Sequence, residues 1–108
     1  MMKHFLILNQ DNLKQIIKHY TKAIVIFGSR YCGSCRLLLK EQLEIIAQKY
    51  PKYTFIYVDA EKDDGTYNHP TSMSLLSIKE IEYWPFWVYF KNGTEQKNGY
   101  LTWGKEVD

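Results

Sequence analysis

Hydrophobic side chains recur at helical spacing in two parts of the chain. In the first part Asp11 stands where it can cap a helix whose apolar positions are Leu13, Ile16, Ile17 and Tyr20. The second part runs from Ser34 to about Tyr50, and Pro51 ends it. Its predicted apolar side comprises Leu38, Leu39, Gln42, Leu43, Ile46 and Tyr50. We therefore predict two amphipathic helices.

Other apolar runs are short and lack the helical period, which is typical of buried strands. Ala23–Phe27 and Tyr53–Val58 are nearly unbroken apolar runs that fit strands buried on both faces of a sheet. Phe86–Phe90 and Thr94–Leu101 flank an Asn-Gly pair, which is the strongest short signal for a β-hairpin. The sequence therefore predicts two buried strands followed by a hairpin.

The predicted elements follow the order helix, strand, helix, strand, helix, strand, strand. The third helix is a short pattern from Leu75 to Ile81, and it follows a polar, turn-rich loop from Asp59 to Ser72. A strand-helix-strand unit implies a right-handed parallel crossover, to which the hairpin adds antiparallel strands. We therefore predict an α/β protein with a mixed sheet, folded as a single domain over residues 1–108.

Composition and charge exclude several classes of function. Aromatic residues make up 16% of the chain, which indicates a packed core rather than disorder. The net charge is only +2 and no dense Lys/Arg cluster is present, so nucleic acid is not an expected partner. The apolar run Phe5–Leu8 is too short for a secretory signal or a membrane span. We expect a cytoplasmic protein that does not associate with membranes.

The candidate chemistry lies in the run Cys-Gly-Ser-Cys at residues 32–35, which holds both cysteines of the chain. Cys32 falls where a buried strand gives way to a helix, so we expect its sulfur near unpaired backbone N–H groups and the positive end of the helix dipole. Arg30 and Arg36 add positive potential, which favours the thiolate that attacks disulfides. We predict that Cys32 is the nucleophile and that Cys35, one helical turn further on, is the resolving thiol.

Two other uses of the cysteine pair are open at this point. A Cys-x-x-Cys pair can provide half of a zinc site, but the remaining candidate ligands, His4, His19 and His69, are scattered along the chain. Alternatively, the two cysteines are reduced residues of the hydrophobic core. The scattered histidines argue against the zinc site, so no metal is expected, and the strand-to-helix junction argues against two purely structural cysteines.

Four landmarks, in order, make the sequence similar to the thioredoxin family. Ile26–Arg36 resembles the active-site segment, which in that family reads as a hydrophobic strand, an aromatic residue, Cys-Gly-Pro-Cys and Lys. Val58-Asp59, Trp84-Pro85 and Phe90-Lys91-Asn92-Gly93 recur in the order that the family uses. The resemblance covers residues from about 10 to 101. It implies a thioredoxin-like fold, in which helices flank a central mixed β-sheet.

The resemblance also implies a substrate groove beside the cysteines. In this family the proline corresponding to Pro85 is cis and adjoins the cysteine pair, and the residue before it pairs its backbone with an extended substrate. The expected substrate-binding residues are Tyr31, Gly33, Ser34, Trp84 and Pro85. Because the electrons are held in the Cys32–Cys35 disulfide couple, no cofactor is expected.

The sequence departs from the family pattern close to the cysteines. Thioredoxins carry a buried aspartate and often a lysine beneath the pair, and the corresponding positions here are Ile26 and Phe55. Proton transfer at Cys35 should then pass through water or the substrate, with slower turnover as a general reductase. Ser34 replaces the usual proline and adds hydrogen-bond donors near the sulfurs. We therefore expect a reduction potential above the thioredoxin value of about −270 mV.

The end of the sequence also differs from the family pattern. Only Thr102–Asp108 follow Leu101, so we expect the family's C-terminal helix to be shortened or absent. The Phe86–Phe90 strand carries apolar side chains on both faces and would then lack part of its cover. A homodimer or another partner interface would supply that cover.

Together these observations predict a thiol-disulfide oxidoreductase that acts on protein or peptide disulfides. The expected partners are protein or peptide thiol and disulfide substrates, and an electron donor of the thioredoxin-reductase type. One alternative is a thioredoxin-like peptide-binding or accessory module with little general reductase activity, which the missing aspartate leaves open. Another is a redox partner dedicated to a single protein.

Overall fold

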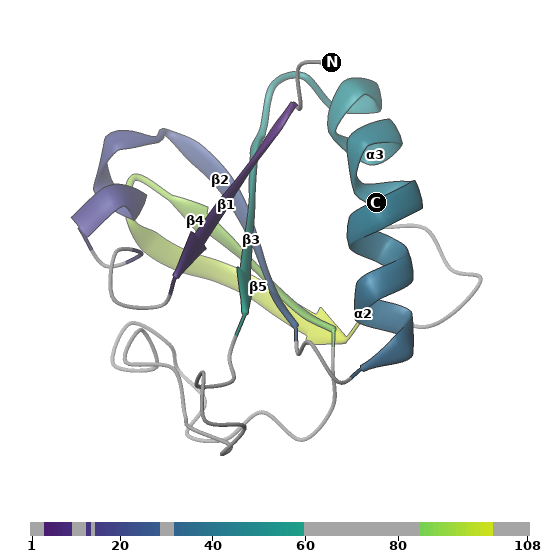
Figure 1. Cartoon of the computed structure of the whole chain (residues 1–108). Coiled ribbons are helices and arrows are strands. Elements are labelled where there is room, and N and C mark those ends of the chain that lie inside the picture. Colours follow the sequence, from purple (N-terminus) through teal and green to yellow (C-terminus); the bar gives the residue numbers. More distant parts are fainter. Residues whose placement is uncertain (1–3, 10–12, 14, 29–31, 60–84, 101–108) are drawn as a thin grey trace.

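A five-stranded mixed sheet forms the centre of the protein in the computed structural model, which describes residues 4–9, 13, 15–28, 32–59 and 85–100 (Figure 1). The strands are β1 (Phe5–Asn9), β2 (Lys22–Gly28), β3 (Thr54–Asp59), β4 (Phe86–Lys91) and β5 (Thr94–Tyr100). Their order across the sheet is β1-β3-β2-β4-β5. β1, β3 and β2 run parallel, whereas β4 and β5 are each antiparallel to the strand before them in that order. The predicted α/β class with a mixed sheet is confirmed.

The edge strand β1 is missing from the predicted order of elements, and that part of the prediction was wrong. β1 pairs in parallel with β3, from Phe5 beside Phe55 to Asn9 beside Asp59. A short, unbroken apolar run such as Phe5–Leu8 has no period that identifies it as a strand. Its partner lies far away along the chain, so the pairing depends on tertiary contacts rather than on a local signal.

One continuous helix leads from the cysteines along one face of the sheet (Figure 1). It consists of α2 (Gly33–Leu37), the π-helical turn η2 (Leu38–Gln42) and α3 (Leu43–Lys49). In the π turn the Leu43 N–H donates a hydrogen bond to the Leu38 carbonyl oxygen. Leu38 and Leu43 are both buried, whereas Gln42 is exposed. The helix and the apolar place of Leu43 were predicted correctly, but the place of Gln42 on the apolar side was wrong, because the wider π turn leaves Gln42 exposed while Leu43 is buried.

The residues before β2 confirm the first predicted helix in part. Leu13, Gln15 and Ile16 are helical, and the short 3-10 helix η1 (Ile17–His19) follows them. Leu13 and Ile17 are completely buried. Asp11 lies outside the described residues, so its capping role stays a prediction.

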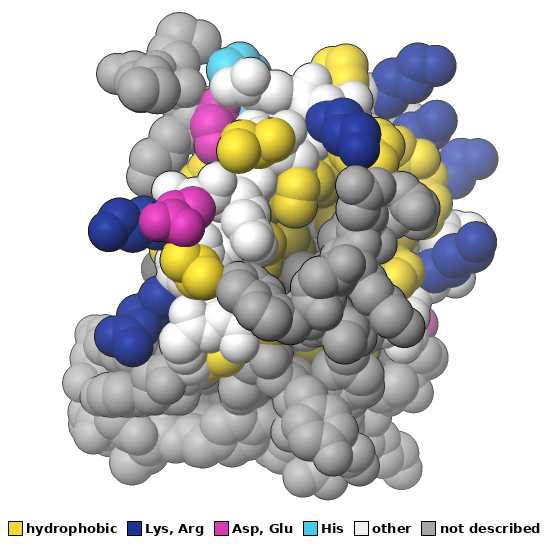
Figure 2. Space-filling model, turned by 90° about the vertical axis from the view of Figure 1, so that its right-hand side faces the viewer, with side chains coloured by type: hydrophobic (Ala, Val, Ile, Leu, Met, Phe, Trp, Pro, Cys, Tyr) yellow, Lys and Arg dark blue, Asp and Glu magenta, His cyan; other side chains and the backbone are white. Residues whose placement is uncertain are grey.

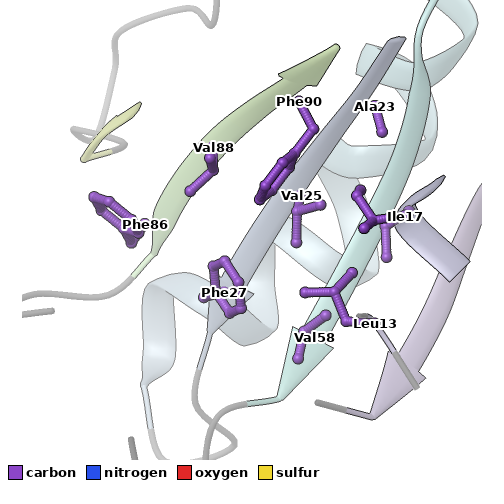
Figure 3. Packing of buried hydrophobic residues seen from close by; sticks show 10 residues of the cluster. Leu13, Ile17, Ala23, Val25, Phe27, Val58, Phe86, Val88 and Phe90 are labelled. Carbon is purple, nitrogen blue, oxygen red and sulfur yellow. The ribbon is translucent and has the colours of Figure 1, made fainter. Parts of the chain in front are cut away.

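Each face of the sheet buries its own hydrophobic cluster. The first cluster, on the side of η1, comprises Leu13, Ile17, Ala23, Val25, Phe27, Ile56, Val58, Phe86, Val88 and Phe90 (Figure 3). The second cluster, beneath the helix that carries the cysteines, comprises Phe5, Ile24, Ile26, Leu38, Leu43, Ala47, Phe55 and Tyr57. Successive residues of β2 and β3 alternate between the two clusters. Burial on both faces explains why these strands are nearly unbroken apolar runs.

The predicted hairpin between β4 and β5 is confirmed. Asn92 and Gly93 have φ angles of 53° and 81°, and a type I′ turn needs positive φ at both central residues. In the hairpin Gly99 of β5 lies opposite Trp87 of β4. A Cβ atom at Gly99 would lie only 3.1 Å from the Trp87 ring. The glycine therefore makes room for the indole at this edge of the sheet.

Several predicted features lie outside the described residues. These are the predicted loop after Asp59 as far as Ser72, the helical pattern from Leu75 to Ile81, and residues 101–108, where a shortened C-terminal helix was expected. Within the described ranges, no helix is long and apolar enough to cross a membrane.

Candidate active site

The cysteine pair lies at the junction between β2 and α2. β2 ends at Gly28, and α2 begins at Gly33 with Cys32 as its N-cap residue. The Cys32 backbone is extended, with φ −92° and ψ 116°, as N-cap residues are. The Cys35 backbone N–H donates a hydrogen bond to Cys32 Sγ over 3.3 Å. The structure thus places this sulfur at a helix N-terminus, where N–H groups favour negative charge.

The two sulfur-bearing side chains differ in their access to solvent. Cys32 is half-buried, whereas Cys35 is 0% exposed. The sulfur that attacks a substrate disulfide must be reachable from outside, whereas the second sulfur has only to reach its neighbour. This arrangement fits Cys32 as the attacking thiol and Cys35 as the resolving thiol. Arg36 is exposed on α2, and Arg30 lies outside the described residues.

The expected substrate-binding residues are only partly described. Gly33 and Ser34 are exposed in the first turn of α2, next to Cys32. Pro85 is buried directly before β4, and Phe86 pairs with Phe27 near the end of β2. The pairing brings Pro85 to the same end of the sheet as the cysteines. The two remaining residues, Tyr31 and Trp84, lie outside the described residues.

Apolar residues occupy the two positions at which the resemblance led us to expect the family's buried aspartate and lysine. Ile26 and Phe55 are each 1% exposed, and both belong to the second cluster. Neither side chain can accept or donate a proton, so these positions offer Cys35 no proton-transfer group.

Tyr57 is a polar residue of the same region that the sequence interpretation missed. It is 4% exposed, belongs to the second cluster and pairs with Ile26 across the β2–β3 ladder. Burial raises the pKa of the Tyr57 hydroxyl above its usual range, and the charges of Cys35, Asp59 and Cys32 raise it further. A period of two could have revealed it, because Tyr57 follows Phe55 on the same face of β3 and lies nearer the cysteines.

Two of the histidines considered as zinc ligands, His4 and His19, do not lie beside the cysteines, and the third, His69, lies outside the described residues. His4, before β1, contacts Glu44 through its backbone N–H and its ring nitrogen Nδ1. His19 is exposed in η1, just before β2 begins. The amino ends of β1 and β2 form the end of the parallel ladder opposite to Cys32. A surface hollow at that far end is lined by His4, Ala47, Gln48, Pro51 and Tyr53.

Comparison with known proteins identifies the family. The Thioredoxin family profile matches residues 4–102. The chain belongs to the thioredoxin family. The match begins before β1 and therefore includes the strand that the hydrophobic pattern did not predict. The protein is accordingly a thiol-disulfide oxidoreductase whose redox group is its own cysteine pair, without a separate cofactor.

Individual thioredoxins show how far the similarity extends. Thioredoxin of Mycoplasmoides gallisepticum is 29% identical over 92 residues, which are 85% of this chain and 80% of that protein. Spinach chloroplast thioredoxin f has a TM-score of 0.68 at 17% identity, with 90% of this chain and 75% of that chain covered. Plasmodium falciparum thioredoxin has a TM-score of 0.65 at 23% identity, with coverages of 89% and 84%. The two solved structures support the thioredoxin fold.

Proposed function

We propose that this thioredoxin exchanges disulfides with protein or peptide substrates, with Cys32 as the attacking thiol and Cys35 as the resolving thiol. The observation that carries the proposal is the arrangement of the pair. The half-buried Cys32 sulfur accepts the Cys35 N–H at a helix N-terminus, and Cys35 is completely buried. One reachable sulfur at a helix N-terminus and one protected sulfur are what a two-step exchange requires.

In the reductive direction the exchange proceeds through a mixed disulfide. The Cys32 thiolate attacks a substrate disulfide, forms a bond to one substrate sulfur and releases the other as a thiolate. Cys35 then loses its proton and attacks Cys32 Sγ. The Cys32–Cys35 bond forms, and the second substrate sulfur leaves as a thiolate and takes up a proton. Two electrons pass from the dithiol to the substrate, and a reductant must then reduce the new disulfide.

The proposed substrate groove lies at the cysteine end of the sheet. Gly33 and Ser34 are exposed beside Cys32, and Pro85 precedes β4 at the same end. We extend the groove to Tyr31 and Trp84 from the family resemblance. An extended peptide would pair with the backbone before Pro85 while its disulfide lies against Cys32.

We further propose that the chain works in the cytoplasm as a single domain and receives electrons from a reductase of the thioredoxin-reductase type. One structural neighbour is a thioredoxin f2 solved in complex with ferredoxin:thioredoxin reductase. Another comes from a study of a yeast mitochondrial peroxiredoxin resolved through glutathione and thioredoxin systems. Those proteins support protein partners for this fold in general.

A substrate assay with cysteine variants tests the proposal. We expect the reduced protein to reduce insulin disulfides and Cys32→Ser to abolish this activity. Cys35→Ser should instead accumulate a mixed disulfide with the substrate, because the resolving step is lost. Absence of insulin reduction together with no reversible Cys32–Cys35 disulfide in a glutathione series would reject the proposal.

A peptide-binding module with little reductase activity is the second candidate, favoured by the apolar Ile26 and Phe55 beneath the cysteines. The same glutathione series separates the two candidates. A defined two-electron transition supports the enzyme, and we expect its potential to lie above about −270 mV. Peptide binding that persists unchanged in a variant without cysteines supports the module.

We also propose that a second copy of the chain covers part of the surface beside the cysteine helix. Figure 2 shows hydrophobic side chains reaching the surface on this side, with Lys and Arg side chains around them. Ile45 of α3 is 67% exposed, and Trp87 and Tyr89 are only half-buried against the second cluster. Light scattering at micromolar concentration should show a dimer, and a monomer contradicts the proposal.

A further inference from the structure

The hydroxyl group of Tyr57 occupies the space beside Gly28, at the end of the strand that leads to the cysteines. A Cβ atom at Gly28 would lie 2.2 Å from the Tyr57 hydroxyl oxygen and 2.8 Å from the ring carbon that carries it. These distances are far below contact distance for real atoms, so only glycine fits here with Tyr57 in place. Tyr57 therefore leans from β3 across the end of β2.

This position lies on the face of the sheet that the cysteine helix covers. Tyr57 pairs with Ile26, and Ile26 and Phe55 belong with it to the second cluster. Cys35 is buried in the first turn of the same helix. Ile26 and Phe55 bring no polar side-chain atom to this region, whereas Tyr57 brings a hydroxyl group.

A buried resolving thiol needs a polar neighbour when it becomes a thiolate. Cys35 must lose its proton before it attacks Cys32, and an unpaired anion in an apolar environment is costly. A hydroxyl group can donate a hydrogen bond to a thiolate. Burial, and then the charge of Cys35, raise the pKa of Tyr57, so Tyr57 keeps its proton and serves as a donor rather than a base.

We propose that the Tyr57 hydroxyl donates a hydrogen bond to Cys35 Sγ as it becomes a thiolate, and so promotes the resolving step. The inference rests on the proposed exchange mechanism and deepens it. The proton of Cys35 leaves to water or to the departing substrate thiolate, while Tyr57 retains its own. Tyr57 thus stabilises the Cys35 thiolate by a hydrogen bond. It does not itself accept the proton of Cys35.

The test removes the oxygen and keeps the ring. In Cys32→Ser protein labelled with ¹³C at cysteine Cβ, the chemical shift of Cys35 reports its ionisation as the pH is raised. Tyr57→Phe should lower the fraction of Cys35 thiolate at a given pH about tenfold, as expected for one lost hydrogen bond to a charged group. Resolution of a mixed disulfide should slow only about threefold, because a thiolate of higher pKa is more nucleophilic.

The matched control is Tyr53→Phe, which removes a hydroxyl from a tyrosine packed on the same cluster but located before β3 begins, at the opposite end. It should leave Cys35 ionisation unchanged. Asp59 and Cys32 are the other titratable groups whose charges reach Tyr57. The titration is therefore repeated in an Asp59→Asn background, where Tyr57→Phe should have the same effect.

A second variant covers the case in which Tyr57→Phe fails to fold. Gly28→Ala places a Cβ where the hydroxyl lies and should change Cys35 ionisation in the same direction. An unchanged or larger thiolate fraction in a folded Tyr57→Phe protein overturns the proposal. Because the titration needs no substrate, its result is independent of whether the wild-type chain reduces insulin.

Discussion

The two faces of the sheet are built from different side chains. The buried residues of the first cluster are all Ala, Val, Leu, Ile or Phe. The second cluster contains Tyr57, and four partly buried aromatic residues with polar tips pack against it, namely Tyr50, Tyr53, Trp87 and Tyr89, whereas among the described residues Tyr20 alone does so at the first cluster. Such side chains combine a large apolar body with a hydrogen-bonding group. The polar-tipped face is also the face on which the helix with Cys35 lies.

The difference indicates that the two faces have different roles, stability alone for the first cluster and both stability and thiol chemistry for the second. The first cluster buries no polar side-chain atom, so burying it carries no cost of polar desolvation. The second cluster tolerates hydroxyl groups because they lie at its margins or, for Tyr57, beside the cysteines. We therefore expect changes in the first cluster to alter stability alone, and changes in the second to alter both stability and thiol chemistry.

The sharpest test of this difference in roles is Phe90→Ala in the first cluster. Phe90 is 0% exposed and pairs with Ala23, at the end of β2 that lies away from the cysteines. We expect the free energy of unfolding to fall by about 3–5 kcal/mol, as for other buried Phe→Ala changes. Urea denaturation measures the loss, and a glutathione series should show an unchanged reduction potential. A shifted potential in the folded variant would contradict this difference in roles.

A slightly smaller effect is expected where the helix contacts the second cluster. Leu43 is completely buried, and Leu43→Ala should lower the free energy of unfolding by about 2–5 kcal/mol. Its neighbour Gln42 is exposed, so Gln42→Ala should change stability by about 0.5 kcal/mol or less. Urea denaturation of both variants checks the π turn directly. Equal losses in the two variants would mean that the helix is regular and that Gln42 faces the sheet.

Gly28→Ala tests the tight contact between the second cluster and the cysteine end. The new methyl group would meet the Tyr57 hydroxyl, and overpacking of this kind destabilises a protein by about 1–3 kcal/mol. Combining it with Tyr57→Phe removes the atom in closest contact, so the double variant should lose less stability than the sum of the single variants. Chemical denaturation of all four proteins provides the measurement. Strict additivity would show that the two residues do not touch.

The smallest effect concerns the polar attachment of the helix to β1. The His4 backbone N–H and the Gln48 side chain donate hydrogen bonds to Glu44 and lower its pKa from 4.5 to about 2. Because the folded state favours the carboxylate, this stabilisation is complete above about pH 4.5 and is lost as the pH falls to about 2. Urea denaturation of wild type and Glu44→Gln should show a difference that shrinks over this interval. A difference that is constant with pH would exclude the carboxylate as its source.

Local signals in the sequence predicted the parts of the fold that depend on local structure. The Asn-Gly pair identified the hairpin because few residues other than asparagine and glycine adopt positive φ easily. The change from strand to helix identified the position of Cys32 at a helix N-terminus. The apolar runs identified β2 and β3 because both faces of these strands are buried.

The missed features depend on contacts between distant parts of the chain. β1 becomes a strand by pairing with β3, and η1, β2 and the helix that carries the cysteines lie between the two in the sequence. The π turn has no sequence signature, since Leu39 and Gln42 continue a regular helical pattern as well as Leu43 does. The place of Tyr57 beside Gly28 depends on the register between β2 and β3. The family resemblance pointed to Ile26 and Phe55 as the positions of the absent aspartate and lysine, and not to Tyr57.

The π turn also bears on how this sequence is aligned with its relatives. A π turn adds one residue to a helix without changing the direction in which the side chains on either side of it point. It is therefore equivalent to a single-residue insertion into a regular α-helix. An alignment without a gap in Leu38–Gln42 would shift every later helix position by one relative to a regular homologous helix. Deleting one residue in this segment should restore a regular α-helix and keep Cys35 and Ala47 on the buried side. A folded deletion variant that keeps the Cys32–Cys35 redox couple would show that the helix absorbs a change in length without moving the cysteine pair.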